Sequence, residues 1–298
     1  MRAAAILGLG CSPKDLKPFQ GEPTVEWQIG MPAPGEVDVI LLFGGDGTIH
    51  RHLGQLVNLG LPVLVVPAGS GNDFATSLGL PRVRNSLAAW QTFLQGRENV
   101  RTTDLGTITP LADGATGDPG LDPRYYSCVA GVGIDAAVAE RANRMPRWLR
   151  GHGGYALSLA PAIFTFAPFP LKILIPCEGR DFTQQWTPRS DRPTLIAAFA
   201  NTPLYGGGMK VAPQAKMDDG VLDVCVVGGV DPFKLFCMFP TVYAGRHLSI
   251  KEVEYFQVSR VRVETEYPMD VYADGEFVCR TPIEVAVQPG VLKVIAPA

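Results

Sequence analysis

The sequence LLFGGDGTIHRH, residues 41–52, decides the fold of this chain. An apolar run over residues 39–43 stops abruptly at GGDGT, and apolar residues then recur at helical spacing at Ile49, Leu53 and Leu56. A continuous apolar run of this kind is typical of a parallel strand that is covered on both faces. The stretch therefore predicts a strand, a glycine turn and a helix, which together are the repeating unit of an α/β layer.

The glycine turn has the features of a phosphate site. A strand that runs through glycines into a helix presents unpaired N–H groups at the helix N-terminus, and phosphate oxygens can approach because glycine has no Cβ. Thr48 stands where its hydroxyl can cap the helix or contact a phosphate. Asp46 would repel phosphates unless a cation lay between them, so it points to Mg²⁺. The alternative is that Asp46 only accepts hydrogen bonds from turn amides, and this turn alone does not separate the two.

A second turn repeats the arrangement. Residues 62–66 read as a strand, the glycine-bearing sequence AGSGND follows at residues 68–73, and a short helix comes next. Two glycine turns at the carboxyl ends of parallel strands converge where open α/β sheets bind their ligands. Each turn again carries an aspartate, Asp46 in the first and Asp73 in the second.

The composition sets limits on the class of protein. The 298 residues are enough for two domains, and a hydrophobic content of 46% with 18% charged residues excludes global disorder. The formal net charge of −3 argues against a protein held to nucleic acid by bulk electrostatics, so no nucleic-acid partner is expected. The six cysteines are scattered without a C-x-x-C pair, which predicts reduced thiols and neither a disulfide framework nor a zinc site.

Two apolar stretches could be mistaken for targeting or membrane segments. Residues 3–9 are apolar but short for a signal peptide, so we expect a first β-strand and a cytoplasmic protein. Residues 151–171 contain no Lys, Arg, Asp or Glu, which is nearly the length of a membrane span. Because Pro161, Pro168 and Pro170 interrupt that run, a buried helix followed by a loop is the better interpretation.

The rhythm of the chain changes after Asp104. Short strands separated by turn residues replace the alternation of strand and helix, and helical patterns are confined to about 135–165 and 232–245. We place a domain boundary near Leu105. Residues 1–105 would form an α/β nucleotide-binding domain with a parallel sheet and helices. Residues 106–298 would form a β-rich, substrate-binding domain whose last residues can return to the first domain.

Further motifs make a family resemblance specific. After GGDGT the chain carries, in order, PAGSGNDFA (67–75), TTDLG (102–106), GVGIDAAV (131–138), NTPLYGGGMKVAPQAKMDDGVLDV (201–224) and ADGE (273–276). This series resembles the catalytic-domain family of diacylglycerol kinases, which includes bacterial lipid kinases and the sphingosine and ceramide kinases. The resemblance extends from about residue 37 to the end. NAD kinases share the first motif but would not be expected to carry GSGNDFA.

The resemblance implies a fold and a set of site residues. It implies an α/β domain followed by a β-sandwich domain, with the active site in the cleft between them. The implied ATP contacts are Gly44, Gly45, Gly47, Thr48, Gly69, Ser70, Gly71 and Asn72. The implied metal-associated residues are Asp46, Asp73 and Asp104, near Mg²⁺ and the phosphates, and Asp219 in a structural metal site. The implied catalytic residues are Asp274 as the general base, with Glu276 and Asp46. Asp-Gly between two strands is also a strong hairpin signal, and a tight turn is a rigid mount for a carboxylate.

The sequence departs from the family pattern at three places. The family's Asn-Pro-x-Ser-Gly after the first strand is replaced by LGLGCSP, residues 7–13, and Arg51 stands where a Glu is expected. For Arg51 we favour a solvated helix face over direct phosphate binding. The structural metal site of bacterial relatives would align with Lys216, Asp219 and the carbonyl of Val221. A protonated lysine cannot be a ligand, so an ammonium–carboxylate pair could replace the ion.

Together these features predict an ATP- and Mg²⁺-dependent lipid kinase. It would transfer the γ-phosphoryl group to a hydroxyl of a lipid such as diacylglycerol, a sphingoid base or phosphatidylglycerol. The alternatives are a kinase of a soluble metabolite and a catalytically impaired nucleotide- or lipid-binding protein. The second is motivated by the lost Asn and Glu, while retention of all the motif carboxylates argues against it.

The expected partners are ATP and a lipid with a free hydroxyl, reached by transient contact at the inner face of the membrane. The segment 141–155 would provide that contact, and an ordinary solvated basic helix is the alternative. Its basic and aromatic residues are Arg141, Arg144, Arg147, Trp148, Arg150 and Tyr155. The sequence does not name the lipid or the oligomeric state, and a homodimer is one possible assembly.

Overall fold

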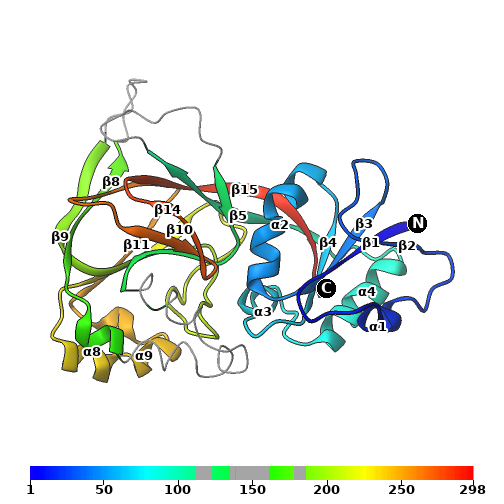
Figure 1. The fold of residues 1–298 in the computed structure, drawn as a ribbon, viewed down its shortest axis with the longest axis horizontal. Coiled ribbons are helices and arrows are strands. Elements are labelled where there is room, and N and C mark those ends of the chain that lie inside the picture. Colours follow the sequence, from blue (N-terminus) through cyan, green and yellow to red (C-terminus); the bar gives the residue numbers. More distant parts are fainter. Residues whose placement is uncertain (112–122, 135–137, 139–160, 178–185, 298) are drawn as a thin grey trace.

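Two regions of different architecture make up the fold, shown in Figure 1. The computed structural model describes residues 1–111, 123–134, 138, 161–177 and 186–297. Their strands belong to one hydrogen-bonded network in which a parallel part and an antiparallel part meet. The basic segment 141–155 lies outside the described residues, so its role in membrane binding stays a prediction.

The N-terminal region is a parallel sheet with helices packed on it. Its strands are β1 (Arg2–Leu7), β2 (Glu26–Ile29), β3 (Val39–Gly44) and β4 (Val63–Pro67), in the spatial order β2-β1-β3-β4. Its helices are α1 (Pro13–Leu16), the 3₁₀ helix η1 (Lys17–Phe19), α2 (Asp46–Leu59), α3 (Asp73–Ser77) and α4 (Val83–Leu94). Every residue of β3 and β4 is buried, as expected for parallel strands covered on both faces.

Helix α2 connects the glycine turn to the sheet core. It buries Ile49, Leu53 and Leu56, the residues whose spacing predicted the helix. It ends at Gly60, which has a left-handed φ of 61° and donates its N–H to the carbonyls of Leu56 and Val57. The opposite side of α2 contacts the β-rich region through β6 (Arg124–Tyr126), so the helix lies between the two regions (Figure 1).

The β-rich region is antiparallel. Its further strands are β5 (Val100–Pro110), β7 (Val129–Gly133), β8 (Phe169–Pro176), β9 (Trp186–Ala200), β10 (Leu222–Gly228), β11 (Val253–Val258), β12 (Arg260–Thr265), β13 (Asp270–Ala273), β14 (Glu276–Arg280) and β15 (Ile283–Ile295). The helices α8 (Pro232–Met238) and α9 (Pro240–Tyr243) and the 3₁₀ helix η2 (His247–Ser249) lie between β10 and β11. Alternating residues of these strands form a second apolar core, separate from the core of the parallel sheet.

Strands β5 and β15 run through both regions. They pair antiparallel from Ile283 opposite Pro110 to Ile295 opposite Val100, and Val294 also lies opposite Val63 of β4. The sequence predicts two strands here, over 283–289 and 291–296, but the structure has one. The reason is a shift of register between Gln288 and Leu292, which interrupts the pairing without ending the strand.

The predicted fold class is confirmed: an α/β region with a parallel sheet precedes a β-sandwich region. The boundary near Leu105 falls inside β5 and not in a linker, so the division into 1–105 and 106–298 remains a proposal. The sequence FQVSRVRVETE, residues 256–266, predicts one strand, but the structure has two, β11 and β12, separated at Ser259. All six cysteines are free thiols. In the described ranges, no helix has both the length and the apolar character needed to cross a bilayer.

Replacement of Gly45 by alanine should destabilise the fold, whereas the same change at Gly54 should not. A Cβ at Gly45 would lie 2.5 Å from the carbonyl oxygen of Gly71 and 2.8 Å from the Cα of Gly69, and both are backbone atoms. We expect Gly45→Ala to lower the free energy of unfolding by about 1–3 kcal/mol, the usual cost of overpacking. A Cβ at Gly54, inside α2, would meet nothing within 4 Å.

The Gly54→Ala variant is therefore the matched control, and it should raise the free energy of unfolding by roughly 0.5–1 kcal/mol because alanine restricts the unfolded chain. Urea unfolding of the parent and both variants measures the two effects. A Gly45→Ala variant as stable as the parent would contradict the close packing of the turns.

Candidate active site

The two glycine turns predicted to bind phosphate lie against each other, backbone to backbone. The N–H of Asp46 donates to the carbonyl of Gly71 at 3.3 Å, and the N–H of Ala68 donates to the carbonyl of Gly44 at 3.1 Å. A Cβ at Gly45 would overlap the second turn, as described above. Glycine is therefore required here to allow two main chains to approach, whatever ligand the turns bind.

Asp46 joins the first turn to helix α3. Its carboxylate accepts the N–H of Asp73 at 3.0 Å and the N–H of Phe74 at 3.1 Å, so it caps the N-terminus of α3. This is the contact with turn amides that the sequence left as an alternative to Mg²⁺ binding. The two functions are compatible, because each carboxylate oxygen accepts only one of these hydrogen bonds and keeps a free lone pair.

Buried negative charge accumulates between Asp46, Asp73 and Asp274. Burial, and after it the charge of Asp73, raises the pKa of Asp46 to about 7, and Asp274 adds a smaller repulsion. The hydrogen bonds from the α3 amides lower this pKa but do not outweigh the other effects. Burial also raises the pKa of Asp73, although the N–H groups of Gly207 and Gly208 oppose it. The carboxylate of Asp73 accepts the N–H of Gly207 at 2.8 Å. Without a cation, this site disfavours full ionisation of its carboxyl groups.

Asp274 occupies the first position of a two-residue hairpin turn. It has a φ of 51° and Gly275 has a φ of 83°, while Ala273 and Glu276 pair on either side. The carboxylate points inward: Oδ1 accepts the N–H of Cys128 at 2.8 Å, and Oδ2 accepts the N–H and the hydroxyl of Ser127 at 2.8 and 3.1 Å. The side chain has no exposed surface.

His50 completes the environment of Asp274 and was missed by the sequence analysis. Its Nδ1 lies 3.1 Å from Oδ2 of Asp274. The available signal was its spacing, since His50 follows Asp46 by one helical turn and so lies on the same face of α2. Burial lowers the pKa of His50, but the hydrogen bond to Asp274 and the charges of Asp274 and Glu276 outweigh it, and the net pKa is raised above 6.5.

Cys128 lies where these groups meet. Burial raises its pKa well above the ordinary thiol value, and the charges of Asp46, Asp274 and Asp73 raise it further. The thiol is therefore neutral and carries no nucleophilic role. Ser127 and Cys128 contribute mainly through backbone N–H groups, which have no residue-specific signal in a sequence.

The remaining predicted contacts are arranged in different ways around the turns. Glu276 is exposed and faces the start of α2: its Oε1 lies 3.0 Å from the position that a Cβ on Gly47 would take.

Asn72 uses its side chain within its own turn. It donates to the carbonyl of Gly69 at 2.9 Å and accepts the N–H of Gly69 at 3.1 Å. Ser70 is exposed on the same turn. The side chain of Thr48 packs against the glycines at residues 8 and 44, and Arg51 is exposed, consistent with a solvated helix face.

Asp104 and Asp219 lie apart from the carboxylates around Cys128. The buried carboxylate of Asp104 accepts the N–H of Gly220 at 2.8 Å and the N–H of Gly290 at 2.7 Å, so it ties a loop to the irregular part of β15. Asp219 is exposed on that loop and accepts the N–H of Val221 at 3.3 Å. The four aspartates predicted to associate with metal therefore do not form one cluster. Among the described residues, no three His, Cys, Asp or Glu side chains are close enough to hold an ion.

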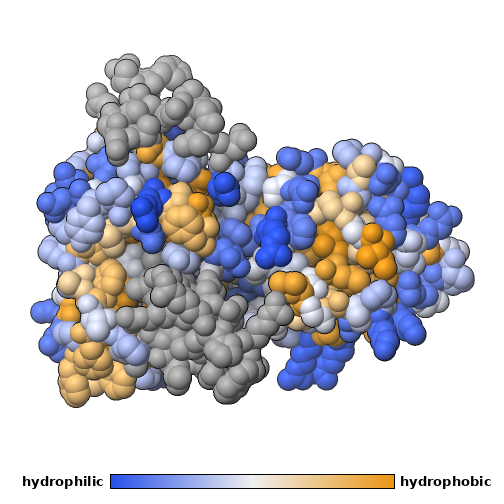
Figure 2. Space-filling model, viewed as in Figure 1, coloured by the Kyte–Doolittle hydropathy of each residue, from blue (hydrophilic) through white to orange (hydrophobic). Residues whose placement is uncertain are grey.

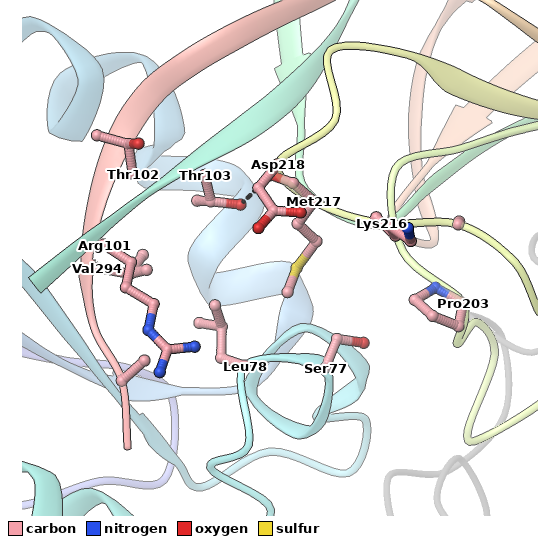
Figure 3. A pocket seen from close by; sticks show the side chains of 12 residues that line it. Ser77, Leu78, Arg101, Thr102, Thr103, Pro203, Lys216, Met217, Asp218 and Val294 are labelled. Atoms are coloured by element: carbon pink, nitrogen blue, oxygen red, sulfur yellow. Dashed lines mark hydrogen bonds between the residues drawn. The ribbon is translucent and has the colours of Figure 1, made fainter. Parts of the chain in front are cut away.

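The loop that carries Lys216 also lines a pocket of about 230 Å³, shown in Figure 3. The hydroxyl of Thr103 fixes this loop by donating to the carbonyl of Met217 at 3.0 Å. The lining residues are Ser77, Leu78, Arg101, Thr102, Thr103, Pro203, Ala215, Lys216, Met217, Asp218, Val294 and Ala296. None of the carboxylates around Cys128 lines this pocket, so it is distinct from the candidate active site.

Comparison with known proteins agrees with this arrangement. Residues 29–108 match the diacylglycerol kinase catalytic domain, and residues 128–296 match the YegS C-terminal NAD kinase beta sandwich-like domain. The diacylglycerol kinase of Mycobacterium tuberculosis (strain ATCC 25618 / H37Rv) is 33% identical over 260 residues, which cover 87% of this chain and 77% of that protein.

Solved structures share the fold. A crystal structure of a diacylglycerol kinase from Bacillus anthracis str. Sterne has a TM-score of 0.65 at 17% identity and covers 99% of this chain and 96% of its own. An NAD kinase from Archaeoglobus fulgidus in complex with ATP has a TM-score of 0.53 at 15% identity and covers 99% and 93%. The chain belongs to the diacylglycerol kinase catalytic-domain family, a family of lipid kinases.

The ionisation of Asp46 should make stability depend on pH. Its folded-state pKa of about 7 exceeds the unfolded value, so its contribution to folding is fully present below about pH 4 and is lost as the pH rises to about 7. In Mg²⁺-free buffer, the parent should therefore lose stability relative to Asp46→Asn across this window. Chemical denaturation at a series of pH values measures the difference.

The exposed residue Asp218 provides the control, since Asp218→Asn should follow the parent curve throughout. If the curves of the parent and Asp46→Asn stayed parallel from about pH 4 to about pH 7, Asp46 would not carry the buried charge described here.

Proposed function

We propose that this protein is an ATP- and Mg²⁺-dependent lipid kinase that phosphorylates a hydroxyl of a lipid of the diacylglycerol class. The observation that carries the proposal is the convergence of two glycine turns with the carboxylates of Asp46, Asp73 and Asp274 at one place. The names of the relatives, which include a diacylglycerol kinase, support a lipid as the acceptor. The ATP complex of the structurally similar NAD kinase supports a nucleotide at this fold.

The residues present fit ATP and Mg²⁺. The turns leave Gly69 and Ser70 exposed, so their main chain is accessible to phosphate oxygens. The raised pKa values of Asp46 and Asp73 report repulsion and burial that a divalent cation would relieve. We therefore assign Asp46 and Asp73 as the residues that would hold Mg²⁺, directly or through water. The bound ion would neutralise charge on the phosphates.

The geometry gives Asp104 and Asp219 a different role in the proposal. Because the carboxylate of Asp104 is occupied by the amides of Gly220 and Gly290, we propose that it fixes the loop carrying Lys216 and Asp219 and not the Mg²⁺ ion. The part of the chain that the structure describes has no ion pair between Lys216 and Asp219. The replacement of the family's structural ion by this pair therefore stays a prediction.

Contact with the membrane has support from an exposed apolar surface. Aromatic side chains lie exposed on α8 and on residues 161–165: Phe233 is 69% exposed, Phe164 57% and Phe236 47%. Figure 2 shows this apolar surface at the lower left, over α8 and α9. Aromatic side chains favour the membrane–water interface, so we include transient membrane contact in the proposed function.

The test of the proposed function is a phosphorylation assay with labelled ATP. The purified chain is incubated with mixed vesicles that contain diacylglycerol, a sphingoid base or phosphatidylglycerol, with and without Mg²⁺, and lipid products are separated. We expect Mg²⁺-dependent labelling of one lipid class. Labelling of soluble alcohols alone would replace lipid by metabolite as the substrate class. ATP binding without any product would indicate a catalytically impaired binding protein.

Asp274 should be essential for turnover. The phosphoryl acceptor must lose its proton as the new bond forms, and Asp274 either takes that proton or holds the group that takes it. Asp274→Asn should therefore lower kcat by about 10² or more while ATP affinity changes little. The matched control is Asp270→Asn on the same hairpin, where the carboxylate lies 2.7 Å from Arg280 and is partly exposed. Single-turnover kinetics and ATP titration measure the two quantities. Turnover of Asp274→Asn within a few-fold of Asp270→Asn would reduce Asp274 to a hairpin residue.

A further inference from the structure

Burial separates the carboxylate of Asp274 from a substrate proton. Its side chain has no exposed surface. Four donors from the protein surround it: the N–H and hydroxyl of Ser127 and Nδ1 of His50 converge on Oδ2, and the N–H of Cys128 donates to Oδ1. A lipid hydroxyl could reach the carboxylate only by opening the protein interior.

His50 provides the exposed end of the same pair. Its ring nitrogen Nδ1 faces Oδ2 of Asp274 at 3.1 Å, and 16% of the side chain is exposed. The other ring nitrogen, Nε2, has no hydrogen bond within the described residues and is not buried. When Nδ1 carries the proton that is donated to Asp274, Nε2 has a free lone pair.

We infer that His50 accepts the proton of the lipid hydroxyl at Nε2, while Asp274 orients the ring and stabilises its positive charge. The inference rests on the lipid kinase activity proposed above. It assigns His50 as the catalytic residue and Asp274 as the positioning residue, in the arrangement of a base held by a buried carboxylate. This differs from the expectation, drawn from the family resemblance, that Asp274 is itself the general base.

The hydroxyl oxygen forms a bond to the γ-phosphorus as the bond between that phosphorus and the bridging oxygen of ATP breaks, and the electron pair of the broken bond leaves with ADP. The hydroxyl proton moves to Nε2, which converts His50 to an imidazolium ion. Asp274 remains ionised and keeps its hydrogen bond to Nδ1–H. Solvent later removes the proton from Nε2 and restores the neutral ring.

The charges around His50 suit a base that works near neutral pH. Asp274 and Glu276 face the ring from the β13–β14 hairpin and favour its charged form, while Arg124 on β6 opposes them. Burial also opposes the charged form, and the net result is a pKa raised above 6.5. A base is most effective when its pKa lies near the working pH, because it is then both unprotonated often enough and basic enough.

The first experiment compares His50→Asn with His52→Asn in the full chain. Asparagine can keep a donor toward Asp274 but cannot accept a proton, so kcat/KM of His50→Asn should fall by about 10²–10⁴. His52 lies on the same helix, is directed at Gln55 with Nδ1 at 3.2 Å from Oε1, and has no contact with Asp274. His52→Asn should match the parent, and thermal unfolding checks that both variants fold.

The pH dependence of kcat/KM separates His50 from a carboxylate base. In the parent, activity should fall as the pH drops through the pKa of His50, which is raised above the ordinary histidine value. A carboxyl group with a raised pKa, such as Asp46, would also give an acid limb, but that limb would persist in His50→Asn. The titration of ATP affects the parent and His50→Asn equally, so a comparison of their two pH profiles removes it. The acid limb that His50 causes in the parent should be absent from the profile of His50→Asn.

A readout without turnover tests the pair directly. In ¹⁵N-histidine NMR spectra of the parent, the signal of His50, assigned by its loss in His50→Asn, should show the tautomer protonated at Nδ1. Asp274→Asn should lower the pKa of that ring, because the anion that stabilises the imidazolium is removed. A protonated Nε2 in the neutral ring, or an unchanged pKa in Asp274→Asn, would overturn the inference.

The activity results separate failure of the inference from failure of the proposed function. A parent that phosphorylates no lipid refutes the lipid kinase proposal and, with it, the role of His50. An active parent whose His50→Asn variant turns over equally fast refutes only the role of His50. If the acid limb persists in His50→Asn and disappears in Glu276→Gln, Glu276 is the proton acceptor and the inference is wrong.

Discussion

Buried carboxylates that accept backbone N–H groups hold this structure together. Four aspartates do this across long stretches of sequence, and each one joins segments that would otherwise be separate loops. Asp46 binds the amides at residues 73 and 74, Asp73 the amide at 207, Asp104 the amides at 220 and 290, and Asp274 the amides at 127 and 128. Hydrogen bonds from N–H groups to an ionised carboxylate are short and strong, and removing one partner leaves a buried charge uncompensated. The motifs around these aspartates therefore specify contacts that hold the fold together.

The same arrangement creates an electrostatic conflict where the two regions meet. Asp46, Asp73 and Asp274 lie close enough to influence one another and the thiol of Cys128, while no arginine or lysine among the described residues forms an ion pair with them. Backbone N–H groups, with the hydroxyl of Ser127 and the ring of His50 at Asp274, partly compensate the charge, and burial raises the pKa values of Asp46 and Asp73. A site that disfavours its own ionisation is prepared for a cation, since binding of positive charge then relieves repulsion already present in the folded chain. His50, which becomes positively charged on protonation, contacts Asp274.

The sequence predicts the local parts of this site and not the contacts that complete it. Strand β3, its glycine turn and α2 are predictable because the spacing of apolar residues and the glycines of a turn are local features of a sequence. The hairpin at Asp274 likewise follows from its Asp-Gly pair. The contact between His50 and Asp274 joins residues 224 positions apart, so no local pattern contains it. The amides at residues 127 and 128 are equally invisible, because every residue except proline has an N–H. Strand β15 was predicted as two strands because proline and glycine at residues 289 and 290 normally end a strand, whereas here the pairing with β5 resumes beyond them.

The return of β15 to the first sheet has a consequence for how the chain acquires its structure. Until Val294 reaches Val63, β4 is an open edge with unpaired backbone groups. During synthesis the parallel sheet therefore stays incomplete until residue 294 has been made, long after its strands β1 to β4. Contacts between segments so distant in sequence slow folding, because a large loop must close before they form. Until then the edge of β4 is a surface on which a strand of another chain could pair, so the return of β15 also protects the first sheet from association.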